Sequence, residues 1–113
     1  MPIIHVYGTS FPKKKEIKET VVEQVSAVTG TPKEAIYVYL HQMEEEDVQK
    51  AAPVVQFFWA ENAASGGPEQ KKQLMKALTD YLADVTGQQK AQVVVTFVDL
   101  PLTNVALGGQ ARG

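Results

Sequence analysis

The sequence predicts an α/β (α+β) fold in which two tandem β-α-β units form one four-stranded sheet with two helices on one face. The prediction depends on two observations about this chain of 113 residues. The order strand, helix, strand occurs twice, and short motifs of the first half recur in the second half. Because one unit of this size buries little apolar surface alone, we expect a single domain, 1–113, built from repeats at 2–50 and 53–109.

The recurring motifs lie at equivalent places in the two halves. Pro2-Ile3-Ile4 recurs as Pro53-Val54-Val55, and Thr29-Gly30 recurs as Thr86-Gly87. The distance along the chain from Thr29 to Thr86 is greater than that from Pro2 to Pro53. The second repeat therefore contains an insertion between these motifs, which we place in the small and polar stretch 61–67. Loops tolerate insertions well, so this stretch is expected to be a loop of the second repeat.

The first half is expected to contain a strand at 3–7, a helix, and a second strand at 35–40. Residues 3–7 are mostly β-branched or aromatic and precede Gly8-Thr9-Ser10, which is typical of a strand followed by a turn. The helix is expected to hold Pro12 in its first turn and to end at Gly30. Its apolar residues recur at helical spacing: Ile17, Val21, Val25 and Val28.

The second half repeats this order, with a strand at 54–59, a helix at 68–85 ending at Gly87, and a strand at 92–98. Two strands joined by such a helix are expected to lie parallel, with a right-handed crossover. With both helices on one face, Ile, Val, Phe and Trp side chains on the opposite face would need cover. We therefore expect the chain to form oligomers.

Composition excludes several classes of site. The chain has no cysteine, so it contains neither disulfides nor thiolate zinc sites. Its two histidines, His5 and His41, lack a metal-binding spacing, and we expect no metal and no cofactor. The net charge of −2 argues against a nucleic-acid partner. No signal peptide or apolar run of membrane-spanning length is present, so we expect a cytoplasmic protein without a membrane partner.

Pro2 is the candidate for catalysis. Removal of Met1, which a small following residue permits, would leave Pro2 with a free secondary amine. An ordinary α-amino group has a pKa of roughly 7.7–8.0, and an apolar pocket lowers it further. Such an amine can act as a general base near neutral pH. The alternative is that a proline simply follows the start codon.

The Met-Pro start on a strand, the repeated unit and the tail Asn104-Val105-Ala106-Leu107-Gly108-Gly109 together resemble the tautomerase superfamily. Each half resembles a 4-oxalocrotonate tautomerase subunit, and the fused layout is similar to macrophage migration inhibitory factor. The resemblance implies a homotrimer in which Pro2 is the general base or acid for keto–enol proton transfer on a small α-keto or enol acid. Pro53 aligns with Pro2, but its nitrogen belongs to an internal amide, so one proline site per chain is expected.

The chain differs from this family in its positively charged residues. Arg112 is the only arginine, so the arginines that hold a dicarboxylate substrate in 4-oxalocrotonate tautomerases have no counterpart. Migration inhibitory factors have a lysine after Thr-Gly, where this chain has Thr31 and then Lys33. We therefore expect substrates less charged than a dianion, such as monoacids or aromatic enols.

The remaining substrate-binding candidates are Tyr37, Lys33, Val105 and Leu107. Tyr37 would donate a hydrogen bond to the enolate oxygen, and Val105 and Leu107 would form an apolar wall. The alternative for these three residues is ordinary packing in a core or a subunit contact. Two other functions also stay open: a catalytically weak trimeric binding or structural protein, and a proline-dependent dehalogenase, hydratase or decarboxylase. The latter reactions need a carboxylate that activates water, and no acidic residue is clearly placed for this in the sequence.

Overall fold

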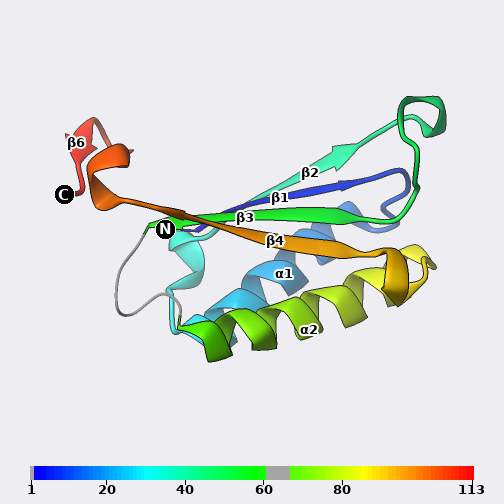
Figure 1. The fold of residues 1–113 in the computed structure, drawn as a ribbon, viewed down its shortest axis with the longest axis horizontal. Helices are drawn as coiled ribbons and strands as arrows, with labels where there is room; N and C mark the ends of the chain where they lie inside the picture. The colour runs from blue at the N-terminus through cyan, green and yellow to red at the C-terminus, as the bar shows by residue number, and fades with distance from the viewer. Residues whose placement is uncertain (1, 61–66) are drawn as a thin grey trace.

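The computed structural model describes residues 2–60 and 67–113, and it contains a four-stranded sheet with two long helices on one face (Figure 1). The strand order is β2-β1-β3-β4. Strand β1 pairs in parallel with β2, β3 pairs in parallel with β4, and β1 and β3 pair antiparallel at the centre. The predicted fold class is therefore confirmed. The bounds are β1 (Ile3–Gly8), α1 (Lys14–Thr29), β2 (Tyr37–Gln42), β3 (Val54–Ala60), α2 (Pro68–Thr86) and β4 (Val94–Leu100).

Short 3-10 turns connect these elements, and a small hairpin ends the chain. The turns are η1 (Lys33–Ala35), η2 (Glu45–Asp47), η3 (Lys90–Gln92) and η4 (Leu102–Asn104). The hairpin pairs β5 (Ala106–Leu107) with β6 (Gln110–Ala111). Gly108 and Gly109 form its turn with φ angles of 60° and 79°, which favour glycine. In Figure 1 the hairpin extends beyond the end of the sheet and away from both helices.

Three element starts differ from the sequence prediction. Strands β2 and β4 begin two residues later than predicted, because Ala35 and Gln92 close 3-10 turns by donating to the carbonyls of Pro32 and Gln89. Pro12 lies outside α1, which begins at Lys14. The intervening Lys13 is in the left-handed region with a φ of 56°, which separates Pro12 from the helix.

Both helices end as the sequence predicts, at glycines. Gly30 and Gly87 have φ angles of 74° and 73°. The Gly30 N–H donates to the Ser26 carbonyl, and the Gly87 N–H donates to carbonyls at the end of α2. A left-handed residue at this position satisfies carbonyls that the helix leaves free, and glycine adopts it at the lowest cost.

The hydrophobic core lies between the sheet and the helices. Alternate residues of β1 and β3 and one stripe of each helix are fully buried there: Ile4, Val6, Val55, Phe57, Ile17, Val21, Val25, Leu74, Leu78 and Leu82. Burial of each such side chain contributes about 1.5–3 kcal/mol relative to exposure. The apolar periodicity in the sequence therefore identified the side of each helix that faces the sheet.

Trp59 is on the helix side of the sheet, whereas the sequence analysis expected a tryptophan on the uncovered face. It is 3% exposed and packs 5.0 Å from Phe57 and 5.3 Å from Phe97, measured between ring centroids. Side chains alternate along a strand, so Trp59 shares the face of Phe57, two residues before it.

The opposite face of the sheet is covered by neither helix. Tyr37, Tyr39, Val54, Val94 and Val98 are exposed large hydrophobic residues. By the same alternation, these five share the face with Ile3, His5, Tyr7, His41, Gln56, Phe58 and Thr96. None of these residues is acidic or a lysine or arginine. Within the described part of the chain, no helix is long and apolar enough to cross a membrane.

Candidate active site at the start of strand β1

Pro2 is buried immediately before β1. Its carbonyl accepts the Tyr37 N–H at 3.0 Å, which starts the parallel pairing of β1 with β2. Pro53 has the same relationship to the second pair, because its carbonyl accepts the Val94 N–H at 3.2 Å. The two prolines therefore occupy equivalent positions in the two halves, but only Pro2 lies where a chain terminus could leave its nitrogen as an amine.

The register of the sheet places Pro2 beside the ends of β3 and β4. Ile3 pairs with Phe58 of the antiparallel strand β3. One residue earlier in the chain, Pro2 therefore lies opposite Trp59, near the end of β3. Trp59 in turn pairs with Asp99 of β4. One edge of the sheet thus combines the starts of β1 and β2 with the ends of β3 and β4.

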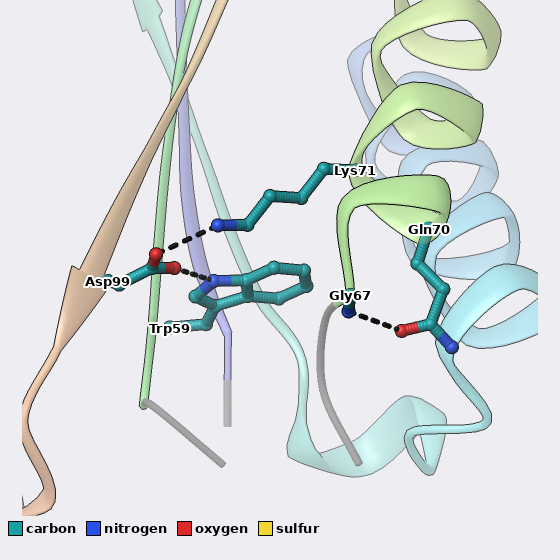
Figure 2. A network of polar contacts seen from close by, with 5 residues as sticks. All are labelled: Trp59, Gly67, Gln70, Lys71 and Asp99. Atoms are coloured by element: carbon teal, nitrogen blue, oxygen red, sulfur yellow. Dashed lines mark hydrogen bonds and ion pairs between the residues drawn. The ribbon is translucent and has the colours of Figure 1, made fainter. Parts of the chain in front are cut away.

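A polar network connects this edge to helix α2. Trp59 Nε1 donates to Asp99 Oδ1 at 2.5 Å, and Lys71 Nζ donates to Asp99 Oδ2 at 2.8 Å (Figure 2). Lys71 Nζ also lies 5.7 Å from the centroid of the Trp59 ring and 5.9 Å from that of Phe97. Both carboxylate oxygens of Asp99 are therefore engaged, and the ammonium group lies against two aromatic rings.

The hydrogen bonds from Lys71 and Trp59 hold the pKa of the Asp99 carboxyl below its ordinary value of 3.8, while desolvation opposes them. Asp99 is consequently ionised at neutral pH. The side chain of Lys71 is 24% exposed and that of Asp99 is 48% exposed. The pair is thus accessible to a solute, and solvent screens part of its attraction.

The first turn of α2 is fixed by contacts that also position Lys71. The Gly67 N–H donates to Gln70 Oε1 at 3.2 Å, as Figure 2 shows. Gln70 Nε2 donates to the Val28 carbonyl at 3.5 Å, which connects the start of α2 to the end of α1. The lysine therefore projects from a helix start that is held on two sides.

Tyr37 and Lys33 lie near this edge, but they point elsewhere. The Tyr37 backbone contacts Pro2, whereas its side chain is on the uncovered face and is 39% exposed. Lys33 Nζ lies 3.7 Å from Glu23 Oε1. It lines a groove of about 590 Å³ between α1 and β2, together with Lys15 and Lys18, and Pro2 is not part of that groove.

Val105 and Leu107 belong to the tail that follows β4. Val105 is 8% exposed, and its carbonyl accepts the Arg112 N–H at 2.8 Å. Leu107 is 46% exposed in the projecting hairpin. Val105 is thus buried within the single chain, whereas Leu107 is exposed and available for contact with another molecule.

Trp59, Lys71 and Asp99 were not identified as site residues from the sequence. Trp59 and Asp99 lie opposite each other only through the register of β3 and β4, which the sequence does not display. Asp99 also supplies the acidic residue at the Pro2 edge that the sequence analysis did not find. The available signal was weak: each residue is the last but one of its strand, and parallel strands end at the same edge.

The histidines lie away from this edge. His5 Nδ1 is 2.8 Å from His41 Nε2 on the uncovered face. Among residues 2–60 and 67–113, no cluster of three or more histidine, cysteine, aspartate or glutamate residues could hold a metal ion.

Comparison with known proteins identifies similarity at the level of a family. The profile of the family described as tautomerase enzyme matches residues 53–112. A search of the curated proteins found no match. The family match thus covers the second repeat and the tail, and it includes Trp59, Lys71 and Asp99.

Solved structures of similar fold extend over almost the whole chain. A fused 4-OT described as a wild-type symmetric trimer has a TM-score of 0.85 at 18% identity, covering 97% of this chain and 94% of that one. Pt0534 inactivated by 2-oxo-3-pentynoate has a TM-score of 0.81 at 24% identity, covering 97% and 96%. A member of the cis-3-chloroacrylic acid dehalogenase family has a TM-score of 0.81 at 13% identity, covering 97% and 82%. At these identities the similarity establishes a shared fold.

Proposed function

Because the chain belongs to the tautomerase enzyme family, we propose that it is an isomerase that catalyses keto–enol tautomerisation of a small α-keto or enol acid. Its general base and acid would be the amino-terminal nitrogen of Pro2 after removal of Met1. The observation that carries this proposal is the buried position of Pro2 at the start of β1, at the same edge as Lys71 and Asp99.

The proposed reaction needs one proton carrier. The neutral amine of Pro2 takes the proton of the enol hydroxyl while the carbon–oxygen double bond forms, and it returns a proton to the neighbouring carbon. Burial of the proline disfavours its charged form, which keeps the nitrogen unprotonated and available as a base near neutral pH. No cofactor or metal is required for this transfer.

We further propose that the protein works as a homotrimer. The similar fused 4-OT is described as a symmetric trimer, and the uncovered face of the sheet has five exposed large hydrophobic residues and no acidic, lysine or arginine residue in its strands. In such an assembly Tyr37 would donate a hydrogen bond to the enolate oxygen, and Val105 and Leu107 would provide an apolar wall. The exposure of Tyr37 and Leu107 in the single chain supports roles that need a second chain.

The test compares the two equivalent prolines. Pro2→Ala keeps a primary amine but loses the secondary amine, so turnover of phenylenolpyruvate and 2-hydroxymuconate should fall by about 10²–10⁴. Pro53→Ala changes an internal amide and should retain most of the rate. Equal loss of rate from both variants, with the fold retained, would contradict the assignment.

Chemical labelling gives a second test of the same nitrogen. The similar protein Pt0534 is inactivated by 2-oxo-3-pentynoate. We expect this reagent to modify Pro2 in the present chain and to abolish turnover, with the adduct located by peptide mass spectrometry. Modification confined to lysines with turnover retained would argue for a binding or structural role.

A dehalogenase is the second candidate, since one similar structure belongs to the cis-3-chloroacrylic acid dehalogenase family and Asp99 supplies a carboxylate at this edge. Lys71 and Trp59 each donate to one oxygen of Asp99 and lower its pKa, which makes the carboxylate a weaker base toward water. Chloride release from 3-chloroacrylate should therefore be much slower than tautomerisation. Faster chloride release would reverse the order of the two candidates.

A further inference from the structure

Lys71 and Asp99 form a partly exposed ion pair at the edge of the sheet where Pro2 begins β1. We propose that Lys71 binds the carboxylate of the keto acid substrate, and that Asp99 restricts the site to substrates with a single carboxylate. The inference rests on the proposed function, since it names the substrate class of that site.

Lys71 has the geometry needed to bind a carboxylate. Its ammonium group has three N–H donors, and one of them is directed to Asp99 Oδ2. The Trp59 and Phe97 rings lie against the same group, which limits the positions that the side chain can adopt. The side chain of Lys71 is 24% exposed, so a ligand at this edge can reach it.

Lys33, the lysine proposed from the sequence, is less well placed. It lies 3.7 Å from Glu23 and lines the groove between α1 and β2 that excludes Pro2. Lys71 instead contacts Trp59, the residue next in register to Pro2. Of these two lysines, Lys71 is therefore the one in contact with the residue beside Pro2.

Asp99 determines how much negative charge this cation can accept. The ammonium and the carboxylate balance each other, so one substrate carboxylate leaves the site with a single net negative charge. A second carboxylate close to Asp99 would meet a like charge, and the single positive charge of Lys71, shared between Asp99 and the first carboxylate, cannot offset it. Trp59 also holds Asp99 in place from its other oxygen, which prevents the carboxylate from turning away.

The experiment measures binding directly and needs no turnover. Trp59 is the only tryptophan of the chain, so intrinsic fluorescence reports on this network. The ligands are 2-oxohexanoate and 2-oxoadipate, which have equal chain length and differ by one carboxylate. The wild-type protein should bind the monoacid about tenfold more tightly, a difference typical of one partly screened charge interaction.

Two variants test the two residues. Lys71→Met should weaken binding of both acids about tenfold through loss of the cation, whereas Lys72→Met, a change at the exposed neighbouring lysine, should leave both affinities unchanged. Asp99→Asn should abolish the preference for the monoacid and keep an oxygen acceptor for Trp59. Asp80→Asn, at a carboxylate that pairs with Lys76 and Lys90, is the matched control. If Asp99→Asn does not fold, Asp99→Ser serves the same purpose.

The outcomes separate this inference from the proposed function. The inference is overturned if the wild-type protein binds neither acid or shows no preference, if the variants at Asp99 keep the preference, or if Lys72→Met weakens binding as much as Lys71→Met. If the binding pattern is as expected but no Pro2-dependent turnover exists, only the proposed function fails.

Discussion

His5 Nδ1 lies 2.8 Å from His41 Nε2, and this contact joins β1 to β2 on the face of the sheet that neither helix covers. The His5 ring is also stacked with Tyr39, and the His41 ring with Tyr7. One imidazole must donate and the other accept, so the contact requires at least one neutral ring.

Loss of this contact should weaken the pairing of β1 with β2. His5→Ala removes one partner of the hydrogen bond, so the free energy of unfolding should fall by about 0.5–1.5 kcal/mol. Urea denaturation measures the difference.

A double substitution, His5→Gln with His41→Gln, provides the control for that measurement. Glutamine keeps hydrogen-bonding groups at both positions. The variant should lose less stability than His5→Ala. Equal losses in the two variants would attribute the effect to ring stacking rather than to the hydrogen bond.

Processing of the amino terminus should control turnover. Protein produced without a tag should lack Met1 by intact mass, since proline in the second position permits removal. Insertion of one alanine before Pro2 converts its nitrogen to an amide, and the rate should fall by about 10²–10⁴. An insertion variant that turns over as fast as the wild-type protein would exclude the Pro2 nitrogen as the base.

The Asp99 network should contribute to stability only where its carboxylate is ionised. Because the folded-state pKa of Asp99 is below the ordinary 3.8, its contribution is present above that value and is lost as the pH falls through the folded-state pKa. Asp99→Asn should lower the free energy of unfolding by about 0.5 kcal/mol at neutral pH, since the pair is partly exposed. Urea denaturation should find no such difference below the folded-state pKa, and a constant difference would point to packing instead.

Gly87 and Gly67 offer a matched pair of substitutions at the two ends of α2. Gly87 has a φ of +73°, so Gly87→Ala is strained even though no atom lies within 4 Å of the added Cβ. We expect a loss of about 1 kcal/mol in the free energy of unfolding. Gly67 has a φ of −71° and similarly open space, so Gly67→Ala should change stability little. Comparable losses in thermal denaturation would mean that backbone conformation does not explain the Gly87 effect.

The sequence identified the elements of this fold well because each has local signals. Ile17, Val21 and Val25 mark the buried stripe of α1, and Gly30 marks its end. The errors occurred where backbone conformation departs from local preference, as at Lys13 before α1 and at the 3-10 turns before β2 and β4. Composition and periodicity do not encode these short turns.

The candidate site was less predictable than the fold because it depends on pairing between distant segments. Pro2 was recognisable from its place in the chain, but its neighbour Trp59 follows from the antiparallel register of β1 and β3. Asp99 then follows from the register of β3 and β4, and Lys71 from the packing of α2 on the sheet. No spacing along the sequence relates these three residues.

The open sides of the sheet have a consequence for how the protein folds after synthesis. Strands β2 and β4 are the outermost in the order β2-β1-β3-β4, so each has one edge without a partner among the described strands of the four-stranded sheet. A newly made chain therefore exposes two unpaired backbone edges together with a face that has five exposed large hydrophobic residues, a combination that favours indiscriminate strand pairing. If the proposed trimer covers these surfaces, folding yield should rise with chain concentration, and dilute refolding or slow expression would prolong the exposed state.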